Sequence, residues 1–417
     1  MSRTWRTLGK MSGAGCTALA AGIVLASIGL SAAQGEDFPL KVRQLSEEEM
    51  VFVPGVSAPL SPMKPKGVTA EPNYKHILPP RYFQARLGSS SLTMVFDCSN
   101  PKARTYDVVY VDRDGDGNLA EETPVQAVGK RGGVLASFQP VTVDLPFAGA
   151  KRQGLVQVRA HISGEQLFQA VVAPATCLEG TVRLGAQECR VALVDGDLSG
   201  VLGDGEGASC ADTLLIDLNG DHAYDRRGGF PIPAAQEVRP LSECWQVGNT
   251  WWSATVAGDW GALTVKPADV EYGELHARGP TVQALVLTSR RHGRLVVTFK
   301  DGVAKLPVGE YAVEQIQLTA KDAQGRPWQL AARGGGGRGL LKVAADAAGE
   351  LDLSKPIVGT VEAYTGAAGQ VQFSLLLAVA GQQVASLTVG GRTPAEPAFA
   401  IRDEKGAAVA IGKFAYG

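Results

Sequence analysis

Carboxylates crowd onto one short stretch of this sequence, residues 108–122, which read VVYVDRDGDGNLAEE. The oxygen-bearing side chains with ligand-like spacing are Asp112, Asp114, Asp116, Asn118 and Glu122. Negative charges this close repel one another unless something neutralises them. A hard cation held by oxygen ligands satisfies all of them at once, whereas a solvated turn built on Asp, Asn and Gly is the plainer alternative. The crowding favours a cation site, here named the first loop (residues 112–122).

Two later stretches repeat this layout. Residues 213–225 read TLLIDLNGDHAYD, and this third loop (217–225) offers Asp217, Asn219, Asp221 and Asp225. Residues 190–200 read RVALVDGDLSG, and this middle loop (195–204) offers Asp195 and Asp197, with Asp204 further on. Each loop follows an alternating apolar run, so the sequence indicates a weak internal repeat in which a strand delivers an acidic loop. The middle loop fits a simple turn equally well, and it would share an ion with the third loop if their strands pair.

The D-x-D-x-D-G spacing of the first loop resembles the first half of EF-hand and dockerin calcium loops. The resemblance implies that oxygens at positions 1, 3 and 5 converge on Ca²⁺ and that Gly117 permits a sharp turn. The third loop has a similar spacing, and both the first and the third loop depart from the family pattern. Position 12 is Thr123 in the first loop, where Glu121 or Glu122 would have to substitute, and the third loop has His222 at position 6 and Gly228 at position 12. No helical pattern flanks either loop, so we expect structural calcium loops in a β context, not true EF-hands.

Catalytic motifs are not evident. The sequence contains no GxSxG, HExxH or Walker A run, and its five histidines are scattered. Glycosidase carboxylates usually face a cleft from separate strands, whereas the acids here share short loops. Trp245, Trp251 and Trp252 would suit an exposed sugar-binding platform, but core packing is the favoured reading. The sequence therefore favours a non-enzymatic protein, while leaving its enzymatic status open.

The elements that must carry these loops are strands. From about residue 81 apolar residues alternate in short runs such as RYFQARL, SLTMVFD and GLVQVRAHI, bounded by Gly, Ser and Asn-Pro turns. This spacing predicts an all-β, multidomain fold of β-sandwiches. The stretch KLPVGEYAVEQIQL (305–318) resembles a strand–turn–strand of transthyretin-like or carboxypeptidase-regulatory domains, which implies an Ig-like sandwich. More loosely, the chain from LLIDLNGD onward resembles secreted bacterial β-rich proteins, a likeness that implies no particular activity.

The N-terminus has the layout of a secretory signal peptide over residues 1–33. Arg3, Arg6 and Lys10 precede an uncharged stretch that ends in small residues at Ser31 and Ala33. An uncleaved membrane anchor is the alternative. We expect export to the periplasm, cell surface or medium. Residues 34–80 are dense in proline and predict a mostly irregular linker, in which LSEEEM could form one helical turn.

The predicted β-domains after this linker span 81–176, with the first loop; 177–277, with the middle and third loops; and 278–417. Five cysteines lie beyond the signal peptide, at Cys98, Cys177, Cys189, Cys210 and Cys244. In an exported chain such cysteines predict disulfides, with one left over. The formal net charge of −2 gives no reason to expect a nucleic-acid partner.

Taken together, the sequence predicts an exported, calcium-stabilised β-sandwich protein that acts as a non-enzymatic binding or structural module. Its partner would be a protein or a glycan. The alternative function is a secreted hydrolase, directed at glycans or peptides, with accessory β-domains.

Overall fold

A computed structural model describes residues 35–75, 78–102, 104–131, 135–147, 150–204, 212–225, 237–334, 340–365 and 371–415. The expected signal peptide, Cys210 and Gly228 lie outside these ranges. The described fold is that of the compact unit Gly35–Gly417. Within the described ranges no helix has the length and apolar character needed to cross a membrane.

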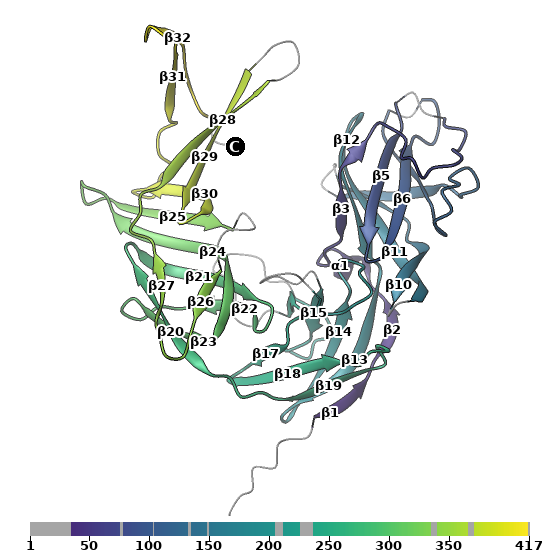
Figure 1. The fold of residues 1–417 in the computed structure, drawn as a ribbon, viewed down its shortest axis with the longest axis horizontal. Helices are drawn as coiled ribbons and strands as arrows, with labels where there is room; N and C mark the ends of the chain where they lie inside the picture. Colours follow the sequence, from purple (N-terminus) through teal and green to yellow (C-terminus); the bar gives the residue numbers. More distant parts are fainter. Residues whose placement is uncertain are drawn as a thin grey trace, which may run out of the picture. The chain divides into compact units, whose positions relative to one another are not determined.

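The predicted all-β fold is confirmed (Figure 1). In the described part of the chain the strands form several mostly antiparallel sheets, and the single helix is α1 (Glu47–Met50). This is the predicted LSEEEM turn. It begins with a capping box, in which Ser46 and Glu49 each bind the other's backbone amide.

The largest sheet has ten strands and carries the first loop. Along the sheet the order is β3 (Val56–Ala58), β12 (Gln166–Pro174), β11 (Ala150–Ser163), β9 (Leu135–Phe138), β8 (Val125–Arg131), β7 (Val108–Val111), β6 (Ser90–Asp97), β5 (Arg81–Leu87) and β4 (Leu60–Ser61), while β10 (Val141–Phe147) pairs with β11. The end strands β3 and β4 are neighbours in the chain, and β3 also contacts β5. The sheet therefore curls around one core, which includes Phe83, Met94, Phe138 and Val158.

Two further sheets carry the middle and third loops. The five-stranded sheet has the order β16 (Val238–Pro240), β15 (Thr213–Ile216), β14 (Gln187–Val194), β13 (Thr176–Leu184) and β2 (Lys41–Gln44). The four-stranded sheet has the order β1 (Glu36–Pro39), β19 (Ala262–Pro267), β18 (Thr250–Val256) and β17 (Cys244–Val247). Trp245 and Trp252 from the second sheet share a core with Val191 and Ile216 from the first. The two sheets thus form a sandwich.

The C-terminal region also has two sheets around one core. A three-stranded sheet has the order β23 (Val303–Pro307), β20 (Tyr272–Arg278) and β27 (Gly349–Asp352), with β20 and β27 parallel. The larger sheet has the order β22 (Gly293–Val297), β21 (Thr281–Ser289), β24 (Gly309–Lys321), β25 (Pro327–Arg333), β30 (Gln382–Val389), β29 (Val371–Val379) and β28 (Val358–Thr365), while β26 (Leu341–Val343) pairs with β24. Within KLPVGEYAVEQIQL the chain crosses from β23 to β24, and so from one sheet to the other, and Tyr311 is buried in the shared core.

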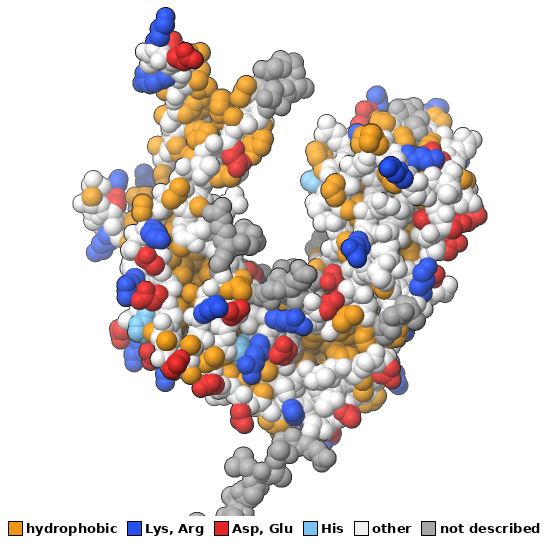
Figure 2. Space-filling view, in the orientation of Figure 1, with side chains coloured by type: hydrophobic (Ala, Val, Ile, Leu, Met, Phe, Trp, Pro, Cys, Tyr) orange, Lys and Arg blue, Asp and Glu red, His pale blue; other side chains and the backbone are white. Residues whose placement is uncertain are grey.

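The last strands are more open to solvent. β31 (Ala398–Arg402) and β32 (Ala408–Lys413) form a separate two-stranded ribbon. Figure 2 shows hydrophobic side chains gathered over this end of the chain, and Val358, Val361, Val409 and Ile411 are among the exposed ones.

The described residues of the Pro-rich segment 34–80 are more ordered than expected. The segment supplies α1 and four short strands, β1 to β4, each paired with a strand from a later part of the chain. Its prolines hide the strand pattern from the sequence, because the strands between them are too short to show a period. The chain passes from the ten-stranded sheet to the five-stranded one between Pro174 and Thr176, and enters the C-terminal sheets between Pro267 and Tyr272.

The expected disulfides are not formed by the described cysteines. Cys98, Cys177, Cys189 and Cys244 are all free and buried. Each lies in a different hydrophobic core cluster. A disulfide requires Cα atoms less than about 7 Å apart, so cysteines that fill separate cores act as small apolar side chains instead.

Candidate metal centres

The first loop begins where a fully buried strand ends. All four residues of β7 are buried, and Asp112 follows directly, with its backbone amide donating to the carbonyl of Thr93 on β6 at 2.9 Å. The chain then turns through two glycines at positive φ, Gly115 (79°) and Gly117 (80°). A Cβ on Gly117 would lie 2.1 Å from the carbonyl oxygen of Gly67, so this position requires glycine.

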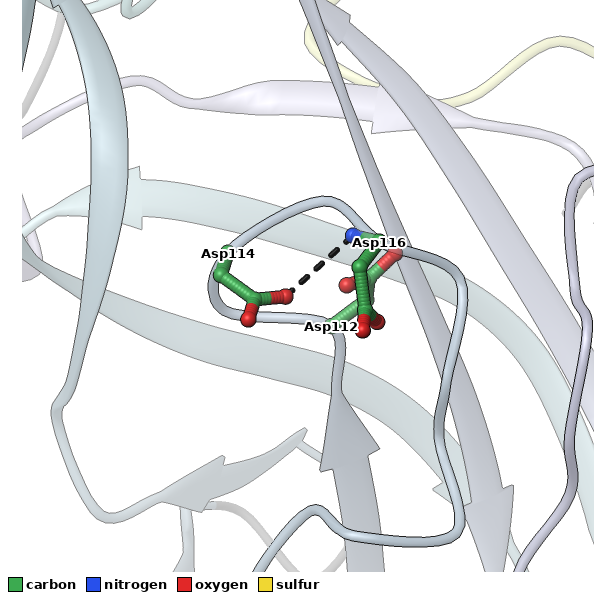
Figure 3. Close-up of side chains that lie close together, drawn as sticks. All are labelled: Asp112, Asp114 and Asp116. Atoms are coloured by element: carbon green, nitrogen blue, oxygen red, sulfur yellow. Dashed lines mark hydrogen bonds between the residues drawn. The ribbon is translucent and has the colours of Figure 1, made fainter.

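The three aspartates of this loop converge (Figure 3). One carboxylate oxygen from each of Asp112, Asp114 and Asp116 lies within 4.8 Å of the other two. Asp112 is buried, and its two oxygens accept the amides of Gly115 at 2.9 Å and Gly117 at 3.2 Å. Burial, reinforced by the charges of Asp114 and Asp116, raises the pKa of Asp112. The loop therefore holds carboxylates close together at an electrostatic cost that a cation would remove.

The other two predicted ligands of the first loop lie differently. Asn118 donates its side-chain amide to Glu121 at 2.9 Å, while its Oδ1 atom is buried without a hydrogen-bond partner. Glu122 accepts the backbone amide of Arg113 at 2.7 Å and pairs with the Arg113 guanidinium at 3.3 Å. Glu122 thus closes the loop at position 2 and does not join the aspartate cluster.

The third loop has the same backbone arrangement. Asp217 follows β15 and is buried, and it accepts the amides of Gly220 at 2.7 Å and His222 at 3.0 Å. Asn219 accepts the amide of Asp221 at 2.8 Å. His222 adopts a φ of 65°, the left-handed conformation of Gly117 in the first loop. The apparent departure at position 6 therefore leaves the loop geometry unchanged.

A buried glutamate that the sequence did not reveal closes the third loop. Glu237, the residue before β16, accepts the amides of Leu218 at 2.9 Å, Asn219 at 3.2 Å and Asp225 at 2.7 Å. Asp225, expected as a position-9 ligand, is held here through its backbone. No sequence spacing pointed to Glu237, because it lies 12 residues after Asp225, the last residue of the third loop.

The middle loop forms a second aspartate cluster. Oxygens of Asp195, Asp197 and Asp212 lie within 4.8 Å of one another. Asp195 follows β14 and accepts the amides of Ser199 at 3.0 Å and Gly200 at 2.8 Å. Asp212, not Asp204, completes the cluster.

Asp212 reaches the cluster because it directly precedes β15, which pairs with β14. Its oxygens accept the amides of Gly196 at 3.0 Å and Gly203 at 2.5 Å. Burial is the main cause that raises the pKa of Asp195 to about 7 and that of Asp212 to about 6, and neighbouring aspartates add to both shifts. The sequence predicted a site shared by the middle and third loops if their strands pair. Strands β14 and β15 do pair, but the acid that joins the middle loop is Asp212, before β15, and not a residue of the third loop.

The three loops share a set of hydrogen bonds. In each loop, the side chain at position 1 accepts the backbone amide of position 6. The side chain at position 3 accepts the backbone amide of position 5, and the side chain at position 5 accepts that of position 7. Positions 4 and 6 have positive φ in all three, with Leu198 at position 4 of the middle loop. A separate acid accepts the amide of position 2 each time, and these acids are Glu122, Asp212 and Glu237. The weak repeat in sequence is therefore a close repeat in structure.

The tryptophans expected in the core are there. Trp245, Trp251 and Trp252 are all at most 9% exposed, so they do not form a sugar-binding platform. His292 is also buried, against the rings of Trp251 and Tyr311. These side chains pack the core of the protein.

Comparisons of the chain with protein-family models, curated proteins and solved structures found no match. The class of protein is thus defined by its own fold and sites: an all-β protein whose described residues include two aspartate clusters that could hold a metal ion.

Proposed function

We propose that this chain is an exported, calcium-stabilised β-protein with a non-enzymatic role, in which its sandwiches bind a partner or build a structure. The observation that carries the proposal is the shared hydrogen-bond pattern of the three acidic loops. One such loop is explained by a polar turn, but three loops with the same backbone geometry, two of which gather three aspartates, favour a common ligand.

Calcium fits the donor atoms better than other common metals. The loops offer carboxylate, amide and hydroxyl oxygens, which Ca²⁺ binds in sets of six to eight. Zinc prefers histidine and cysteine, and the described cysteines lie buried in the cores. Magnesium requires a stricter octahedral geometry. In the first loop Asp112, Asp114 and Asp116 would hold the ion, with the orphaned Oδ1 of Asn118 close by in the sequence.

Calcium in these loops would join separate parts of the fold. The first loop exchanges hydrogen bonds with the N-terminal segment, from Leu119 to the carbonyl of Ala70 and from Thr69 to that of Gly117. The middle and third loops tie the ends of β14 and β15 to acids that precede β15 and β16. An ion at one hundred times its Kd would add about 2.7 kcal/mol of stability per site.

The exported location rests on the N-terminal sequence pattern, and it suits calcium loops, because extracellular modules work with Kd values of about 10⁻⁴–10⁻³ M. The partner remains a protein or a glycan. The buried tryptophans argue against one specific glycan platform. No particular feature of the described residues favours the hydrolase alternative.

Isothermal titration of the full chain with CaCl₂ tests this proposal. We expect saturable binding, with weaker binding of MgCl₂, and fewer sites in the Asp112→Ala variant. Asp403→Ala is the matched control, because Asp403 accepts two backbone amides in an exposed hairpin turn that belongs to neither aspartate cluster. Absence of calcium binding, or equal loss of sites in both variants, would contradict the proposal.

A further inference from the structure

A mostly apolar cavity of about 280 Å³ lies beside the middle loop. Its walls come from β10, β11, β13 and β14, from the middle loop and from the turn at Trp260. The principal apolar side chains that line it are Leu145, Phe147, Leu178, Leu193, Leu198 and Trp260. Small-molecule sites are typically concave and apolar with a few polar groups, and this cavity has that character.

Two of the apolar walls are held in an unusual backbone conformation. Leu198 has a φ of 56° and Trp260 a φ of 61°, and bulky residues rarely adopt such angles. The first and third loops have glycine at the position of Leu198. Strain of this kind persists where the surrounding structure enforces it, and it gathers at ligand sites. The middle loop thus retains a strained leucine that forms part of the cavity wall.

The available charge at the cavity is positive. Arg152 is exposed, its guanidinium lies 5.2 Å from the centre of the Phe147 ring, and it forms no ion pair with any described residue. Asp195 also lines the cavity, but both of its oxygens accept amides of its own loop. Trp260 stands edge-on against Phe147, with ring centres 4.6 Å apart.

We propose that this cavity binds a small carboxylic acid, with its apolar body between the walls and its carboxylate on Arg152. The volume equals that of about nine water molecules, which suits a ligand of the order of ten non-hydrogen atoms. A guanidinium beside an aromatic ring recognises a carboxylate through two parallel hydrogen bonds. The proposal does not rest on calcium binding, although the middle loop contributes Asp195 and Leu198 to the cavity wall.

Titration of the full chain with octanoate, in calcium-containing buffer, tests the assignment. We expect one saturable site, and at least about tenfold weaker binding by Arg152→Gln, the loss expected for a charge-assisted pair. Thr142→Trp, at an exposed position that lines the cavity, should abolish binding by filling it. The control is Lys151→Gln, the neighbouring cation on β11, which lies 3.9 Å from Asp144 and should bind octanoate normally.

Binding of octan-1-ol, which has the alkyl chain of octanoate but no charge, shows how much of the affinity depends on the carboxylate. If octan-1-ol binds as tightly as octanoate, the role assigned to Arg152 is wrong. Absence of saturable octanoate binding, or unchanged binding by Thr142→Trp, would overturn the site itself. Because calcium binding is measured separately, failure of either proposal leaves the other standing.

Discussion

The first and third loops reach one backbone geometry with different residues. The first has aspartates at positions 1, 3 and 5 and glycine at position 6, whereas the third has Asn219 at position 3 and His222 at position 6. The first is closed by Glu122, within the same loop, and the third by Glu237, at the start of another strand. The geometry therefore depends on where oxygens and positive φ angles fall, and less on which residue supplies them. Four sets of variants test this shared geometry and extend the test to the middle loop.

Asp112→Ala should have the largest effect. The variant removes a buried carboxylate that accepts two amides, and each hydrogen bond to a charged group contributes about 1.5–3 kcal/mol. We expect a loss of about 3 kcal/mol in calcium-free urea unfolding and loss of the part of the calcium response that the first loop supplies. Asp114→Ala, at an exposed position of the same cluster, should lose the same part of the calcium response with little change in calcium-free stability. If Asp112→Ala retains the full calcium response, the first loop is not a main site.

Glu237→Gln should destabilise the protein more than Glu122→Gln. Glu237 is buried and accepts three amides, so a glutamine would direct its NH₂ group at one or more of them. We expect a loss of about 2 kcal/mol for Glu237→Gln and less than about 1 kcal/mol for Glu122→Gln, which accepts one amide. If both variants lose the same free energy of unfolding in urea, Glu237 does not stabilise its loop more than Glu122 does.

The middle loop should make calcium-free stability depend on pH. Because the pKa of Asp195 is raised to about 7 and that of Asp212 to about 6, the folded state binds more protons than the unfolded state above pH 4. The stability that proton binding to Asp195 and Asp212 contributes is therefore lost as the pH rises from about 4 to 7. Asp195→Asn should flatten that fall in thermal unfolding with chelator. Calcium needs the ionised carboxylates, so its stabilisation should grow over the same pH range. If Asp195→Asn and the unaltered protein show the same dependence of Tm on pH, Asp195 is not the group responsible.

His222→Gly should have the smallest effect, and it should stabilise the protein. His222 is held at a φ of 65° with its side chain 84% exposed. Glycine removes the strain but is more flexible when unfolded, so the expected net gain is about 0.5–1 kcal/mol. The reciprocal change, Gly117→Ala, should destabilise, because its Cβ would meet the Gly67 carbonyl. A loss of stability in His222→Gly would mean that its imidazole supports the loop.

The sequence predicted what is local and missed what is brought together by pairing. Alternation in runs such as RYFQARL was sufficient to predict strands, and Asp112, Asp114 and Asp116 converge because five consecutive residues share one turn. The short strands of residues 34–80 were missed because their partners lie far along the chain.

The closing acids and the cysteines show the same limit. Asp212 and Glu237 lie near their loops only because β15 pairs with β14 and β16 pairs with β15. The disulfide prediction was wrong for the described cysteines because cysteine spacing says nothing of which core each side chain fills. His222 was read as a departure because a sequence does not display its φ angle.

Thermal unfolding of the full chain in calcium and in chelator decides whether the acidic loops hold calcium. Calcium at saturating concentration should raise the Tm by at least about 3 °C over EGTA, with a smaller rise in magnesium. The same comparison should show a clearly smaller rise for Asp112→Ala and an unchanged rise for Asp403→Ala. Identical Tm values for the unaltered protein in calcium and in EGTA would contradict the claim that these loops hold calcium.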